Sequence, residues 1–253
     1  MKTFTISMVM VALLGIFNNL HSQELTLGVK GGLSIPNLTG GGTENPLNAG
    51  YSSRLGANYG LYGEYHLSDL FSITLGVEYS SQGGKKNKFQ ALAVPAEMVP
   101  LLPPNTPYLY ADYNSEAILD YLLVPVMGRF SRKLTATSPI KVYASVGPFA
   151  GFLLKAHQVT SGSSIMYMDA GGTMPVTVQP QSFDSDTNIK DQLRTFNTGV
   201  IGFIGIAYQI SSNNSIFIEG GGNYGFISIQ KGTSNGNNYT GAGVVTVGYA
   251  YSF

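Results

Sequence analysis

Hydrophobic and polar residues alternate one by one over several stretches of the chain. In the clearest stretch, 71–80, every second residue is apolar: Phe71, Ile73, Leu75, Val77 and Tyr79. Successive side chains of a β-strand point to opposite faces, so this period predicts strands with one apolar and one polar face. The strands expected from this pattern are 25–34, 54–66, 71–80, 118–130, 140–155, 196–210, 216–229 and 245–253.

The segments between these strands alternate in length. Short connectors such as 67–69 and 211–215 contrast with the long segments 82–116 and 157–194. Loops beyond ~15 residues are uncommon in compact soluble domains, whereas outer-membrane barrels combine short periplasmic turns with long external loops. The sequence therefore predicts an all-β fold, an eight-stranded antiparallel up-and-down transmembrane β-barrel.

Composition supports a membrane environment. Only 11% of the 253 residues are charged, against roughly 25% in an average soluble domain. Outside the N-terminal segment, no run approaches the ~18 apolar residues of a membrane helix. A chain embedded in lipid must then be a closed barrel, because lipid cannot satisfy the open edge of a sheet. Equal numbers of basic and acidic residues give no indication of a nucleic-acid partner, and the absence of Cys excludes disulfides and thiolate metal sites.

The N-terminal segment has the features of a signal peptide. Lys2 supplies a positive charge, 6–17 is apolar, and 18–22 is a polar, cleavage-like stretch. We expect residues 1–22 to be a cleavable signal peptide and residues 23–253 to be the exported barrel domain.

The last expected strand carries a second export-related pattern. Its alternate residues Val247, Tyr249, Tyr251 and Phe253 form one apolar face. This arrangement resembles the C-terminal signal of bacterial outer-membrane barrels, which implies recognition by the barrel-assembly machinery during insertion and contact with outer-membrane lipid.

Aromatic residues also gather near the ends of the expected strands, as in the girdles of membrane barrels. We expect a periplasmic girdle of Tyr65, Phe71, Phe130, Tyr208, Tyr251 and Phe253, and an outer girdle of Tyr79, Phe152, Tyr224 and Phe226.

Placing the apolar faces outward brings charged residues of both signs into the interior: Lys30, Glu64, Glu78, Arg129, Lys141 and Glu219. The lumen of an eight-stranded barrel is only wide enough to be filled by side chains. Unpaired charges there are costly, whereas paired ones are tolerated. We therefore expect a plugged, ion-paired polar lumen, with glycines such as Gly60 leaving room for the long side chains.

Two strands do not fit the pattern well. If Arg129 points inward, Asp120 points outward, and Ile201 and Phe203 interrupt the apolar face of 196–210. Pro125 and Pro148 lie nearly opposite each other in neighbouring strands. Because proline cannot donate to the ladder, we expect a bulge or a local break there.

Four segments carry a resemblance to a known family: 27–34 (LGVKGGLS), 60–69 (GLYGEYHLSD), 121–126 (YLLVPV) and 146–151 (VGPFAG). Together they resemble the PorT-like outer-membrane β-barrel family of Bacteroidota. The resemblance implies a porin-like integral outer-membrane protein with no active site. One branch of this family is associated with type IX secretion and gliding.

The sequence leaves several functions open. The first is a non-enzymatic barrel whose loops 82–116 and 157–194 engage an envelope or extracellular partner, since loops on rigid scaffolds commonly carry function. The second is a narrow porin-like channel or small-solute transporter. The third, a secreted soluble eight-stranded ligand carrier, requires the apolar faces to point inward.

An enzyme is not expected, and neither are a cofactor, a metal or catalytic residues. The expected barrel contains only two histidines, His66 and His157, which fall at opposite ends of the barrel, so they cannot cooperate. Asp184 and Asp186 supply fewer ligands than a calcium loop needs.

Overall fold

The computed structural model describes residues 25–40, 46–47, 49–232 and 237–253, so the expected signal peptide lies outside the described residues. Strands dominate these residues. No helix among them is both long enough and apolar enough to cross a membrane.

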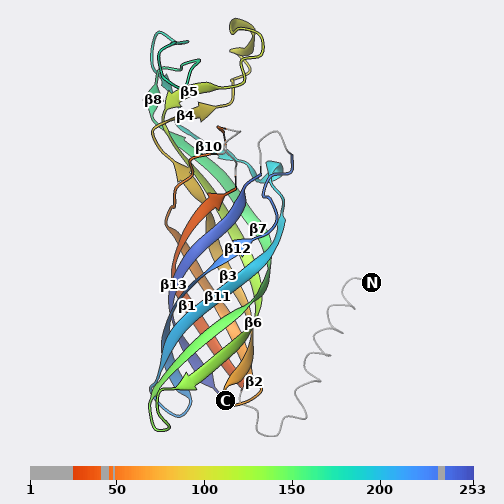
Figure 1. The fold of residues 1–253 in the computed structure, drawn as a ribbon, viewed down its shortest axis with the longest axis vertical. Helices are drawn as coiled ribbons and strands as arrows, with labels where there is room; N and C mark the ends of the chain where they lie inside the picture. The colour runs from red at the N-terminus through yellow and green to blue at the C-terminus, as the bar shows by residue number, and fades with distance from the viewer. Residues whose placement is uncertain (1–24, 41–45, 48, 233–236) are drawn as a thin grey trace, which may run out of the picture.

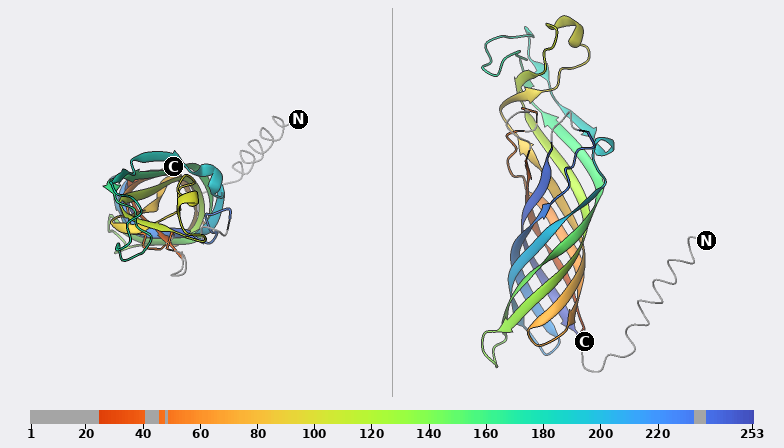
Figure 2. Two further views of the ribbon diagram at one scale, coloured as in Figure 1. Left: turned by 90° about the horizontal axis from the view of Figure 1, so that it is seen from above. Right: turned by 45° about the vertical axis from the view of Figure 1, so that its right-hand side comes forward.

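Eight long strands form a closed antiparallel ring (Figures 1 and 2). The ring is closed by pairing of β1 with β13 and of β6 with β7. Its members are β1 (Leu25–Thr39), β2 (Gly56–His66), β3 (Phe71–Lys86), β6 (Asn114–Lys133), β7 (Ile140–Ser161), β11 (Phe196–Gln209), β12 (Asn214–Gly225) and β13 (Tyr239–Ser252). This confirms the predicted up-and-down barrel.

The alternating pattern places apolar side chains outside and polar ones inside. Leu61 is 62% exposed and Ile204 is 70% exposed on the outer face, whereas Ser34, Thr74 and Glu78 are almost fully buried within the barrel. A soluble carrier requires the opposite arrangement, so that hypothesis is wrong.

The structure settles the two ambiguous strands. Arg129 is buried inside the barrel, and Asp120 lies on the outer side, where the Ser81 hydroxyl donates a hydrogen bond to its Oδ1 at 2.9 Å. This contact explains how a carboxylate is accommodated there. Ile201 and Phe203 are buried in the lumen, so the outer face of β11 is formed by Val200, Ile204, Ile206 and Tyr208.

The expected break at the prolines is present. Pairing of β6 with β7 is interrupted between Pro125 and Gly128, next to Pro148, and resumes in the same register. Pairing of β3 with β6 is also interrupted beside Pro125. The register shift itself lies elsewhere, between Asp120 and Tyr121.

The two ends of the barrel differ strongly. At one end, β2–β3, β6–β7 and β11–β12 are joined by short turns, and the C-terminus lies there (Figure 1). We call this the short-turn end. At the long-loop end, β3, β6 and β7 extend well beyond the predicted limits, because they continue into the segments expected to be loops.

Those segments contain further elements. The first holds β4 (Phe89–Leu92), the 3₁₀ turn η2 (Val99–Leu101) and β5 (Leu109–Asp112). The second holds β8 (Ser163–Ser164), β9 (Gln181–Ser182), β10 (Ser185–Asn188) and the 3₁₀ turn η3 (Lys190–Gln192). The segments 82–116 and 157–194, predicted as long loops, therefore carry short strands and 3₁₀ turns of their own.

Aromatic residues line both ends of the outer face. Tyr251 packs edge-on against Phe253 at the short-turn end, where Phe71 pairs with Phe130. Tyr59 stacks on Tyr79 toward the other end. Phe196 lies edge-on against Phe152, one of the expected girdle residues, at that same end.

Candidate functional site

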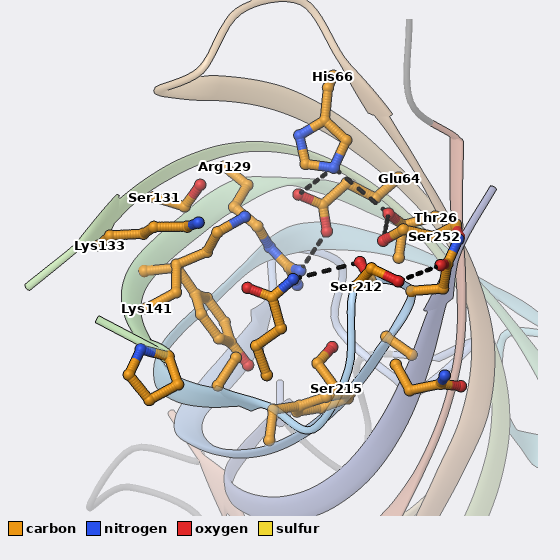
Figure 3. A pocket seen from close by; sticks show the side chains of 18 of the residues that line it. Thr26, Glu64, His66, Arg129, Ser131, Lys133, Lys141, Ser212, Ser215 and Ser252 are labelled. Carbon is orange, nitrogen blue, oxygen red and sulfur yellow. Dashed lines mark hydrogen bonds and ion pairs between the residues drawn. The ribbon is translucent and has the colours of Figure 1, made fainter. Parts of the chain in front are cut away.

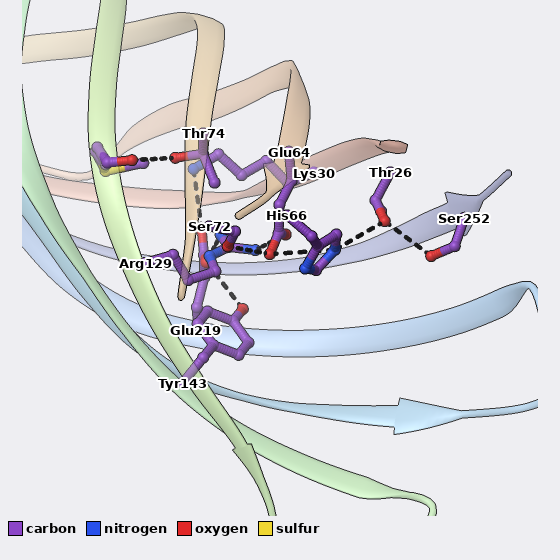
Figure 4. A network of polar contacts seen from close by, with 11 residues as sticks. Thr26, Lys30, Glu64, His66, Ser72, Thr74, Arg129, Tyr143, Glu219 and Ser252 are labelled. Carbon is purple, nitrogen blue, oxygen red and sulfur yellow. Dashed lines mark hydrogen bonds and ion pairs between the residues drawn. The ribbon is translucent and has the colours of Figure 1, made fainter. Parts of the chain in front are cut away.

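A connected set of buried charges occupies the part of the lumen nearer the short-turn end. Figure 4 shows four of these charges, Lys30, Glu64, Arg129 and Glu219. We call Lys30, Glu64, Glu78, Arg129 and Glu219 the lumen network. The ammonium of Lys30 lies 2.8 Å from Glu78 Oε1 and 2.9 Å from Glu219 Oε1. One cation on β1 thus joins carboxylates from β3 and β12.

A second pair completes this network. An Arg129 guanidinium nitrogen donates to Glu64 Oε2 at 2.7 Å, and the other terminal nitrogen lies 3.9 Å from Glu219 Oε2. The Ser72 hydroxyl donates to Glu64 at 2.6 Å, and the Tyr143 hydroxyl donates to Glu219 at 2.9 Å. These hydrogen bonds give the carboxylates further partners beside the cations, as a buried ion pair requires.

The structure brings five of the six predicted lumen charges together, and the sixth lies apart. Lys141 lines the mouth of the barrel at the short-turn end and is half-buried there. It forms no ion pair with any other described residue. His66, which was not predicted as part of the network, lies with Nε2 3.7 Å from Glu64 Oε1.

Part of the remaining lumen departs from the expected polar interior. An apolar cluster, contributed mainly by β6, β7 and β11, lies above the network and includes Leu119, Tyr121, Leu123, Phe149, Ile201 and Phe203. The cavities at the two mouths, of about 220 Å³ and about 520 Å³, share no lining residue. Hydrophobic packing thus contributes to the plug as well as charge.

At the long-loop end, the two long segments fold against each other into one unit. We call residues 89–113 and 163–183 the head. Its buried core consists of Leu109, Ala111, Tyr113 and Met166, against which Leu92, Val94, Met98, Leu102, Met168, Val176 and Phe183 pack. The backbone N–H of Tyr110 donates to the carbonyl of Tyr167 at 2.8 Å, and Tyr167 donates back at 2.8 Å.

Aromatic contacts reinforce the head. The Tyr113 and Phe183 rings stack with centroids 4.7 Å apart, and Phe89 contacts both Tyr110 and Tyr167. Burial raises the pKa of Tyr113 to about 12, so its hydroxyl stays neutral at physiological pH. The sequence contained one indication of the head: apolar residues such as Leu109 and Met166 occur inside segments that are rich in polar residues.

The histidine and aspartate residues considered for catalysis or metal binding are not gathered at one site. His66 ends β2 at the short-turn end, whereas His157 lies far along β7, with Nδ1 2.8 Å from Asp186 Oδ1. Asp184 accepts a hydrogen bond from the backbone N–H of Gly162. Within the described ranges, no group of three or more His, Asp or Glu side chains is placed to hold a metal ion.

Comparison with known proteins identifies the barrel. The family model described as "Outer membrane protein beta-barrel domain" matches residues 19–231. No curated protein matches the chain.

Several solved structures match the chain at low sequence identity. Neisserial surface protein A from Neisseria is 13% identical over 90% of this chain and 97% of its own, with a TM-score of 0.37. Ail, the attachment invasion locus protein of Yersinia pestis, is 13% identical over 92% and 100%, with a TM-score of 0.37. A major outer membrane protein from Thermus thermophilus is 12% identical over 92% and 100%, with a TM-score of 0.43. These similarities do not bear on the function of this chain.

Proposed function

The chain belongs to the outer membrane protein β-barrel domain family, and on that basis we propose that it is a non-enzymatic protein whose extracellular head binds a protein partner. Its barrel resides in the bacterial outer membrane. The short-turn end faces the periplasm and the long-loop end faces the outside, as in other bacterial outer-membrane barrels.

The observation that carries this proposal is the co-folding of two distant segments into a head with its own core. A loop that only spans between strands needs no such core. Because backbone pairing and aromatic contacts hold the head together, its surface is ordered before a partner arrives. Preorganisation lowers the entropy cost of binding.

The outer surface of the head suits a protein partner with an apolar patch. Leu101 is 79% exposed and Val178 is 95% exposed, and Val99 and Met174 are also largely exposed. The segment around η2 lies at the tip, remote from the barrel (Figure 1). Apolar side chains exposed to water on the head favour association with another apolar surface.

Site-specific photo-crosslinking in intact cells tests this proposal. A crosslinker at position 101 or 178 should yield adducts with one protein, whereas a crosslinker at Leu134, exposed in the periplasmic β6–β7 turn, should not. With the purified partner, the Leu101→Ser/Val178→Ser variant should bind about tenfold more weakly. Leu134→Ser should bind normally. Identical adducts at all three positions, or none at the head, would refute the proposal.

A narrow channel is the second candidate, because polar side chains inside the barrel have atoms without partners. Asn58, Gln82, Asn223 and Ser34 each have a buried side-chain atom with no hydrogen-bond partner. Such groups attract ordered water. The apolar cluster argues against ion flow, so planar bilayers containing the protein should remain silent. Conductance that changes selectivity in Glu78→Gln would favour the channel instead.

The proposal extends to a more specific family, the PorT-like outer-membrane barrels, and to a C-terminal assembly signal. The segments 27–34, 60–69, 121–126 and 146–151 support membership in the PorT-like family of Bacteroidota, and with it a secretion-related role. Deletion of the gene should then impair type IX secretion.

The outward-facing side chains of Val247, Tyr249, Tyr251 and Phe253 are accessible to the barrel-assembly machinery. Replacing Phe253 with Ser should slow insertion.

A further inference from the structure

The periplasmic mouth of the barrel contains a cavity whose chemistry neither the head nor the lumen network accounts for (Figure 3). Its volume is about 220 Å³. Cationic side chains from β6 and β7 line it, namely Arg129, Lys133 and Lys141, together with His66 from β2. Hydroxyl and amide groups of Ser131, Ser212 and Asn213 also contribute to its wall.

Two of these cations are directly opposed. Lys133 on β6 and Lys141 on β7 are cross-strand partners, and both line the cavity. Like charges in this position repel each other. In the described part of the chain, no carboxylate lies within 4.0 Å of either ammonium group. No ion pair among the described residues therefore offsets this repulsion, although Glu64 lies within electrostatic range of Lys141.

The third cation is also incompletely satisfied. Arg129 is 6% exposed, and although one terminal nitrogen binds Glu64, its Nε is buried without a hydrogen-bond partner. The only carboxylate lining the cavity, that of Glu64, is already held by Arg129 and Ser72. The cavity thus presents three cationic side chains against one carboxylate.

We propose that this mouth is a binding site for a phosphate-type oxyanion, held by Lys133 and Lys141 with Arg129 behind them. An oxyanion between the two ammonium groups would turn their repulsion into attraction. A phosphate group carries about two negative charges and several acceptor oxygens, and lysine is a common phosphate ligand. The volume admits such a group but falls below the ~300 Å³ typical of sites for drug-sized molecules.

Free phosphate and the phosphomonoester headgroup of a lipid share this chemistry. Titration calorimetry of the full-length barrel with inorganic phosphate, in uncharged detergent at about 0.15 M salt, tests the first source. Retention of phosphatidic acid over phosphatidylcholine in native mass spectrometry tests the second. Binding in either arm supports the site and identifies its source.

Matched variants distinguish a specific phosphate site from nonspecific electrostatic attraction to the protein. Lys133→Gln/Lys141→Gln should weaken binding about tenfold or more. Lys155→Gln/Lys231→Gln removes the same charge from exposed positions outside the mouth and should leave binding unchanged. Lys133 and Lys141 have no ion pair to lose among the described residues, and heat-modifiable gel mobility checks that each variant is folded. Absence of wild-type binding in both arms, or equal weakening in both variants, would overturn the proposal.

Discussion

Lys30 and Glu78 form a salt bridge of 2.8 Å across a strand that lies between them. Both residues pair with Gly60 of β2, Lys30 from β1 and Glu78 from β3. Because Gly60 has no side chain, the two charged chains meet above its backbone. The central ion pair of the lumen thus depends on a glycine that makes no polar side-chain contact itself.

Removal of Lys30 should destabilise the barrel strongly. Lys30→Met leaves the buried Glu78 carboxylate without its cation, and breaking a buried pair in this way costs about 3–5 kcal/mol. Urea unfolding in lipid vesicles measures the loss. Lys30→Met/Glu78→Gln should recover part of it, because the unpaired charge is gone. A change no larger than that of Lys155→Met, at an exposed position, would contradict this prediction.

Gly60→Ala should also lower the free energy of unfolding. A Cβ at this position would lie 2.5 Å from the Val77 carbonyl oxygen and 2.9 Å from Glu78 Cγ, so we expect a cost of about 1–3 kcal/mol. Gly63→Ala on the same strand is the matched control, since its Cβ would have its nearest contact at 3.6 Å, with Leu27. Equal stabilities of the two variants would show that the row of Lys30, Gly60 and Glu78 is not tightly packed.

The head should unfold separately from the barrel. Leu109 is fully buried in the head core, so Leu109→Ala should cost about 2–5 kcal/mol of local stability. Limited proteolysis of cells should then cleave residues 89–113 and 163–183 much faster, while the heat-modifiable mobility of the barrel is unchanged. Leu101→Ala, at an exposed position, should have no such effect. If Leu109→Ala left proteolysis unchanged, the head core would not be what orders these segments.

One turn of the head should respond to acid. The Asp169 carboxylate accepts backbone hydrogen bonds from Met174 at 2.7 Å, Thr173 at 3.0 Å and Gly171 at 3.1 Å, and these, led by that of Met174, lower its pKa. A lowered pKa means that the carboxylate stabilises the turn above the unfolded value of ~3.9. This contribution is lost as the pH falls through the lower folded value.

Amide chemical shifts of Thr173 and Met174 provide the measurement. They should move together as the pH falls below the ordinary range for Asp and should not move in Asp169→Asn, which has no titrating group there. Titration of these amides in the variant as well would assign the effect to another residue.

The alternation of apolar and polar residues predicted the barrel well. Both the period of two and the choice of the face that points outward can be read from a single strand. Phe71, Ile73 and Lys30 could be placed in this way. Arg129 was ambiguous, since facing it inward required Asp120 to face outward, and the Ser81 partner that accommodates Asp120 lies on another strand.

What the sequence could not predict depends on contacts between distant segments. Leu109 and Met166 have no periodic neighbours, so nothing local indicates that they pack together in the head. The isolation of Lys141 from the lumen network likewise follows from its position at the mouth, which depends on where the turn after Lys133 falls.

The extension of β6 and β7 connects the head to the barrel wall. Beyond the last β7–β11 pair at Phe152, the two strands continue to pair with each other as far as Asn114 and Ser161, below the head. A partner pulling outward on the head would draw on both strands along their length. The hydrogen bonds that anchor them to β3 and β11 would then be loaded in shear, many at once, and would not be peeled open one by one. If the head binds a partner as we propose, this hairpin would act as a tether that holds the partner against traction from outside the cell.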